Sequence, residues 1–76
     1  DLNGPIGVVM DPRNGSLYVA NYLKNDIVRV EPSGQVSVLA SGLKKPYNLL
    51  LDTLTNTLYV TEQETNSVSR IKLSPG

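Results

Sequence analysis

The chain has 76 residues, a formal net charge of zero, and no cysteine, histidine, tryptophan or phenylalanine. A balanced charge argues against a nucleic-acid or anionic-membrane surface, because both require an excess of lysine and arginine. No apolar run approaches the ~20 residues that a membrane span requires, and no disulfide can stabilise so short a chain. The cysteine-free composition suits an oxidising compartment, so an extracytoplasmic or secreted location is favoured.

Seven short strands are predicted, separated by turn residues. Asn14-Gly15 is a hairpin signal after the first strand, although Asn14-Gly15-Ser16 also fits an N-glycosylation acceptor. The polar stretch 21–25 is predicted to be a loop in which Asn25 adopts a positive φ. Turns and β-branched residues are too dense for an amphipathic helix, so the predicted fold class is all-β. The predicted strands are 6–10, 16–20, 26–31, 35–40, 47–51, 57–61 and 67–73.

The sequence contains an internal repeat. Pro46 stands 41 positions (46 minus 5) after Pro5, and at the same spacing Leu17-Tyr18-Val19 corresponds to Leu58-Tyr59-Val60. A repeat of about 40–45 residues is the length of a four-stranded propeller blade. The sequence therefore predicts two antiparallel β-propeller blades, residues 1–41 and residues 42–76, the second of which lacks its outer strand.

Two blades cannot close a propeller, which typically has about 4–8 blades around a channel. Both sheet surfaces are therefore expected to need covering by other propeller blades, which are the predicted partners. These blades belong either to a longer parent chain or to further copies of this one, and three copies would form a six-bladed ring. The unpaired edge of strand 67–73 would be an aggregation hazard at each junction of such a ring, which favours the longer parent chain.

Both copies of the repeat carry a family pattern. The sequence resembles the NHL-repeat β-propellers over essentially the whole chain. In the first copy the resemblance is carried by GPIGVVMD and GSLYVANYLKNDIVRVEPSG, and in the second copy by KPYNLLLD and NTLYVTEQETNSVSRIKL. The blade pattern is also related to that of gluconolactonase-like propellers and lipoprotein-receptor propellers. The latter carry a Tyr-Trp-Thr-Asp motif, and Leu58-Tyr59-Val60-Thr61 departs from it by lacking tryptophan. The resemblance implies a six-bladed propeller that is a non-catalytic binding or scaffold module.

Differences between the two copies indicate where a binding site could lie, because the scaffold must be uniform whereas a site need not be. The copies differ at Gly7 and Asn48, and at Asn21 and Glu62. The resemblance implies that a protein or small-molecule ligand binds at the rim of the channel mouth, where the loops after the second strands meet the starts of the inner strands. The alternative is a solvated polar rim. The candidate binding residues are Tyr22, Lys24, Tyr47, Asn48, Glu62 and Glu64.

Residues that are identical in the two copies have structural interpretations. Asp11 and Asp52 precede turns and are expected to accept hydrogen bonds from turn amides. Arg29 and Arg70 are expected to bridge carboxylates, since the guanidinium group suits planar contacts.

An enzymatic alternative also follows from the resemblance, namely a portion of a metal-dependent hydrolase or lyase of gluconolactonase type. Asn21, Asn48 and Glu62 offer the oxygen ligands that hard cations prefer. However, the Asn-Gly pair that follows Pro in that family is Ile6-Gly7 and Tyr47-Asn48 here, so its metal-binding motif does not carry over. Lyase chemistry of the virginiamycin type would require a histidine, which the sequence lacks. No catalytic residue, metal ligand or cofactor is therefore predicted within this chain, and the enzymatic interpretation is the less favoured.

Overall fold

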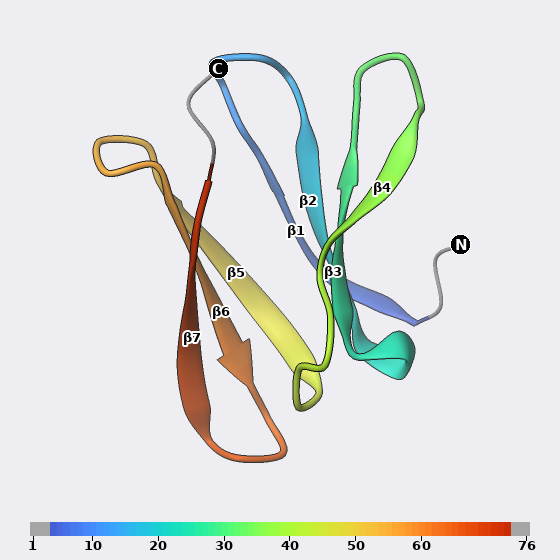
Figure 1. Ribbon diagram of the computed structural model, residues 1–76, viewed down its shortest axis with the longest axis vertical. Coiled ribbons are helices and arrows are strands. Elements are labelled where there is room, and N and C mark those ends of the chain that lie inside the picture. Colours follow the sequence, from blue (N-terminus) through green and yellow to red (C-terminus); the bar gives the residue numbers. More distant parts are fainter. Residues whose placement is uncertain (1–3, 74–76) are drawn as a thin grey trace.

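The computed structural model describes residues 4–73, which form two antiparallel β-sheets (Figure 1). The first sheet has the strand order β1-β2-β3-β4, and the second has the order β5-β6-β7. One turn of 3-10 helix, η1 (Tyr22–Lys24), lies between β2 and β3. No helix within the described residues has the length and apolar character needed to cross a membrane. The strands are β1 (Pro5–Met10), β2 (Leu17–Asn21), β3 (Asp26–Val30), β4 (Val36–Ala40), β5 (Pro46–Asp52), β6 (Thr57–Glu62) and β7 (Ser67–Lys72).

The all-β fold and the seven predicted strands are confirmed, and no strand end differs from its predicted position by more than one residue. The stretch 21–25, predicted to be a loop, contains the 3-10 turn instead. Asn25 ends this turn in the left-handed conformation (φ 57°), as expected, and its amide donates to the carbonyl oxygen of Tyr22 at 3.4 Å. A single helical turn leaves no periodic signal in a sequence, which is why it was not predicted.

The backbone repeats with the same spacing as the sequence. A register shift interrupts the pairing of the first strand in each sheet, between Pro5 and Val8 in β1 and between Pro46 and Leu49 in β5. Three pairs of left-handed residues also recur at this spacing: Gly4 and Lys45 (φ 66° and 60°), Gly15 and Asn56 (78° and 56°), and Asn25 and Asn66 (57° and 49°). Non-glycine residues seldom adopt a positive φ. The recurrence of left-handed backbone positions at the spacing of the repeat therefore shows that the two sheets are two copies of one structural unit.

The recurring aspartates close turns, as predicted. Asp11 Oδ1 accepts a hydrogen bond from the amide of Arg13 at 3.0 Å, and Asp52 Oδ1 accepts one from the amide of Leu54 at 3.0 Å. The Arg13 guanidinium also donates to both carboxylate oxygens of Asp11, and this hydrogen bonding lowers the pKa of Asp11. At Asn14, the side-chain oxygen accepts from the amide of Ser16 at 2.9 Å, which is the geometry of a hairpin turn.

Arg29 forms the ion pair expected of it, but with a carboxylate two residues further along the chain. Its Nε lies 2.9 Å from a carboxylate oxygen of Glu31, outside hydrogen-bond geometry. Arg70, the equivalent residue in the second sheet, is exposed. The repeat therefore preserves the arginine but not its surroundings.

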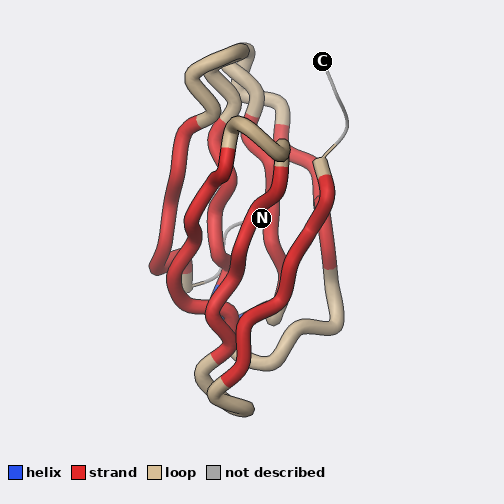
Figure 2. Tube along the Cα trace, turned by 90° about the vertical axis from the view of Figure 1, so that its left-hand side faces the viewer, coloured by secondary structure: helices blue, strands red, loops and turns tan. Residues whose placement is uncertain are grey.

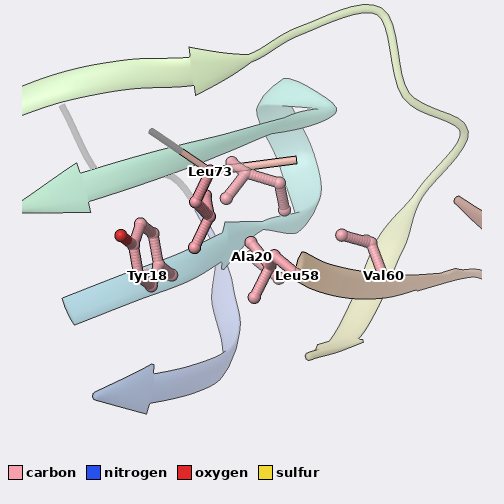
Figure 3. Close-up of a cluster of buried hydrophobic side chains, with 6 residues drawn as sticks. Tyr18, Ala20, Leu58, Val60 and Leu73 are labelled. Carbon is pink, nitrogen blue, oxygen red and sulfur yellow. The ribbon is translucent and has the colours of Figure 1, made fainter. Parts of the chain in front are cut away.

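The core lies between the two sheets (Figure 3). From β2, Tyr18 lies beside Leu73 and Ala20 lies beside Leu58 of β6, and burial raises the pKa of Tyr18. Each fully buried large apolar side chain contributes about 1.5–3 kcal/mol. Among residues 4–73, the buried cluster consists of Tyr18, Ala20, Ile27, Leu58, Val60 and Leu73. The two sheets are therefore held together face to face, with the loops gathered at the two ends of the strands (Figure 2).

The inner strands β1 and β5 approach each other most closely at a glycine. A Cβ atom at Gly7 would lie 2.4 Å from the carbonyl oxygen of Tyr47. No side chain can be accommodated at that distance without moving backbone, so glycine at this position permits the close packing of the two sheets.

Candidate functional site

The rim predicted from the sequence lies at the end of the strands where η1, the segment 41–45 and the start of β5 come together (Figure 1). We call the segment 41–45, which joins the two sheets, the linker. Asn25 holds it with two hydrogen bonds: its carbonyl oxygen accepts from the amide of Leu43 at 3.0 Å, and its Oδ1 accepts from the amide of Lys45 at 3.1 Å. The amide of Gln63 then donates to the carbonyl oxygen of Lys45 at 2.9 Å. The backbone of the linker is therefore held by hydrogen bonds to residues of both sheets.

Two of the predicted residues form an aromatic pair on this rim. The rings of Tyr22 and Tyr47 are 6.5 Å apart between centroids and meet edge to face at 77°. The Nζ atom of Lys45 lies 5.3 Å from the centroid of the Tyr22 ring, within cation–π range. Both tyrosines remain partly exposed. Lys45 was not among the predicted residues, although its position immediately before Pro46 and Tyr47 is a signal that could have identified it.

Glu62, at the end of β6, is only 6% exposed. Its Oε2 accepts a hydrogen bond from the amide of Lys44 at 2.8 Å, and its Oε1 accepts one from the hydroxyl of Ser69. Both carboxylate oxygens therefore already have partners. The geometry makes Glu62 a residue that positions the linker.

The other predicted residues are exposed and do not join the tyrosine pair. Asn48 donates its backbone amide to the hydroxyl of Thr61 at 2.9 Å, and Glu64 donates its amide to the carbonyl oxygen of Lys44 at 3.3 Å. The side chain of Lys24 instead lines a hollow on the outer part of the first sheet. The structure thus brings Tyr22 and Tyr47 together, buries Glu62 against the linker, and leaves the remaining three exposed outside this pair.

The hollow that Lys24 lines was not predicted. It has a volume of about 160 Å³ and contains a buried carboxylate, since Asp26 is 7% exposed and its Oδ1 has no hydrogen-bond partner. Its lining residues are Lys24, Asp26, Val28, Val36, Ser37 and Val38.

The acidic residues do not converge on a common point. Across residues 4–73, no three side chains of histidine, cysteine, aspartate or glutamate lie close enough together to hold a metal ion.

No protein-family model matches the sequence, and no curated protein matches it. Solved structures do match. A streptogramin B lyase is similar to 96% of this chain at 14% identity with a TM-score of 0.60, over 28% of its own length. Virginiamycin B lyase from Staphylococcus aureus is similar to 93% of this chain at 13% identity with a TM-score of 0.58, over 27% of its own length.

This likeness concerns the fold, because the sequence identity is low. The chain spans about a quarter of the length of these two proteins. Together with the repeated antiparallel pattern of the two sheets, the match identifies them as β-propeller blades, the second without an outer strand among the described residues.

Proposed function

We propose that this chain is a non-catalytic portion of an NHL-like, six-bladed β-propeller that acts as a binding or scaffold module. A protein or small-molecule ligand binds at the rim. The observation that carries this proposal is the cluster of Tyr22, Tyr47 and Lys45, which joins η1, the linker and β5 on one exposed surface.

The chemistry of the rim favours a ligand with a planar or apolar group and a negative charge. The two partly exposed tyrosine rings offer apolar contact area with a polar hydroxyl at the edge. Lys24, Lys44 and Lys45 carry positive charge along the same end of the molecule. Of the two glutamates in the rim loop, Glu62 is engaged by Lys44 and Ser69, so only Glu64 presents an exposed carboxylate.

The test begins with a library of acidic, aromatic-containing peptides and small molecules screened against the immobilised protein. For the strongest binder, Tyr22→Ala and Tyr47→Ala are expected to weaken affinity by about tenfold each, which corresponds to about 1.4 kcal/mol. Lys24→Ala and Glu64→Ala report on the periphery of the rim. Tyr59→Ala is the matched control, because Tyr59 lies in the middle of β6, away from the rim. Affinity that is unchanged in all four rim variants rules the proposal out.

A second function is supported by the names of the two structural neighbours, which are lyases. Under this alternative the chain is a portion of a metal-dependent propeller hydrolase or lyase of gluconolactonase type. The residues present do not by themselves fit a metal site, since Asn21 and Glu62 are buried and both oxygens of Glu62 have partners. The metal ligands and the catalytic groups would then come from other blades.

Calorimetry with Ca²⁺ and Mg²⁺ on the complete ring, followed by incubation of the ring with virginiamycin B, tests this alternative. Heat of binding together with conversion of virginiamycin B supports it. A ring that binds neither cation and leaves virginiamycin B intact eliminates it.

A further inference from the structure

Each sheet has one face in the internal interface and one face that no described residue from the other sheet covers. Strand pairing aligns Val8, Val19, Val28 and Val38 in one row across the first sheet, on the side opposite to Tyr18 and Ala20. We call this side the first free face. In the second sheet, pairing places Leu50 beside Tyr59 and Thr61 beside Val68, on the side opposite to Leu58 and Val60. We call this side the second free face.

Both free faces carry exposed apolar side chains, although Val19 and Val28, at the centre of the row on the first, are only 6% and 2% exposed. On the first, Val8 is 61% exposed and Val38 is 62% exposed; on the second, Leu50 is 65% exposed and Val68 is 61% exposed. Large exposed apolar side chains gathered on one face of a sheet mark an interaction site.

The repeat relates the two free faces to the internal interface. The first sheet contributes Val9, Tyr18, Ala20 and Ile27 to that interface, and the residues at the equivalent positions of the second sheet are Leu50, Tyr59, Thr61 and Val68. The second sheet contributes Leu49, Leu51, Leu58 and Val60, and their equivalents in the first sheet are Val8, Met10, Leu17 and Val19. The second free face therefore corresponds to one half of the internal interface, and the first free face corresponds to the other half.

We propose that a second copy of this chain docks head to tail, with its first free face on the second free face of the first copy. The contact continues the internal interface by one more step of the same stacking. Such a heterologous contact generates rings when its rotation closes. The docking uses sheet faces and not the rim, so a rim that binds no ligand leaves it standing.

A polar contact supports the same register. Inside the chain, Asn25 Oδ1 accepts from the amide of Lys45. The equivalent residues are Asn66 and Gly4, which have the same left-handed backbone conformations, with φ 49° and 66°. Asn66 is exposed. In the docked pair, Asn66 of one copy would accept from the amide of Gly4 of the next copy.

A buried carboxylate on the first free face points the same way. Asp26 Oδ1 has no hydrogen-bond partner although its residue is 7% exposed. Leaving such an acceptor unpaired is unfavourable, and a donor from a docked copy would relieve that cost.

At one position the proposed contact between copies cannot match the internal interface. The internal interface has Gly7 at its closest approach, whereas the second sheet has Asn48 there. Because a Cβ atom at Gly7 would lie 2.4 Å from the carbonyl oxygen of Tyr47, a copy docked on Asn48 must stand further off at its inner strand. Asn48→Gly is therefore expected to strengthen the association, and a weaker association in this variant contradicts the proposed register.

The experiment is light scattering of the purified chain over a wide range of concentrations. The expected result is a particle mass that rises in multiples of 8.2 kDa. Val8→Asp and Val68→Asp each place a charge on a different free face, and each variant alone is expected to be monomeric. An equimolar mixture is expected to form dimers and nothing larger, because one intact copy of each face remains.

The matched control is Leu54→Asp, since Leu54 is 95% exposed in the β5–β6 turn and lies on neither face. It should assemble like the unmodified chain. Circular dichroism of each variant verifies that the strands are retained. A chain that is monomeric at every concentration overturns the proposal and assigns the free faces to a different occupant. Dimers of one variant alone overturn it too, since they require a symmetric face-to-face contact.

Discussion

Ile27 of the first sheet is fully buried, whereas Val68, the equivalent residue of the second sheet, is 61% exposed. Both occupy the third strand of their sheets, and both side chains are β-branched and apolar. They differ because the second sheet covers the face that carries Ile27, while no described residue of another sheet covers the face that carries Val68. The burial of these two residues is thus decided by position in the stack of sheets and not by the strand sequence.

The first two strands of each sheet show a second difference. Gly7 and Ala20 allow the second sheet to approach the first, but their equivalents are Asn48 and Thr61, which are exposed. Apolar residues at the equivalent positions show that both sheets are built for stacking. In the proposed head-to-tail docking, these polar residues would hold the docked copy further from the second sheet near its inner strand.

The largest effect is expected where the two sheets differ most in burial. Ile27→Ala should destabilise the protein by about 2–5 kcal/mol, because it leaves a cavity in the core. Val68→Ala should change the free energy of unfolding by less than about 0.5 kcal/mol at concentrations where the chain is monomeric. Urea unfolding followed by circular dichroism measures both. Equal losses in the two variants would break the comparison.

The next effect concerns the close approach of the inner strands. Gly7→Ala is expected to cost about 1–3 kcal/mol, because the new methyl group would meet the carbonyl oxygen of Tyr47 and force the sheets apart. Asn48→Ala serves as the control at the equivalent position and should be nearly neutral. Thermal unfolding of the pair provides the test, and a neutral Gly7→Ala would show that the close approach does not hold the sheets.

Glu62 and Glu64 allow a matched comparison within one loop. Glu62→Ala leaves the amide of Lys44 and the hydroxyl of Ser69 without their acceptor, which should cost about 1–3 kcal/mol. Glu64→Ala should have little effect, since Glu64 is exposed. Chemical unfolding distinguishes the two. If both variants are equally stable, Glu62 does not position the linker.

The smallest effect is a dependence on acid. Hydrogen bonding from Arg13 lowers the pKa of Asp11 below its ordinary value of 3.8. The stabilisation is therefore fully present above the unfolded-state pKa and is lost as the pH falls through the lower pKa of the folded state. Asp11→Asn should flatten the fall of the unfolding midpoint below pH 3.8. Asp52→Asn should flatten it less, because the Asp52 carboxylate, whose pKa is lowered chiefly by a hydrogen bond from Thr55, is more exposed. An unaltered acid profile in Asp11→Asn would contradict the role of this pair.

Much of the fold was predictable because alternation, turn residues and the repeat all indicate the same strands. The positive φ of Asn25 was predicted from its residue type, but that of Lys45 was not, since lysine seldom adopts it. Only the alignment of Lys45 with Gly4 reveals it.

The candidate site was less predictable. The meeting of Tyr22 and Tyr47 follows from the blade architecture. The burial of Glu62 depends on the path of the linker and on the hydroxyl of Ser69 across the sheet, neither of which has a local signal in the sequence.

The central claim is that the two repeats pack face to face as consecutive blades through Tyr18 and Ile27 on one side and Leu58 and Leu73 on the other. Nuclear Overhauser contacts between these side chains test it most directly. The structure predicts cross-peaks between the ring of Tyr18 or the methyl groups of Ile27 and the methyl groups of Leu58 or Leu73. A spectrum in which these side chains show contacts only within their own sheet would contradict it.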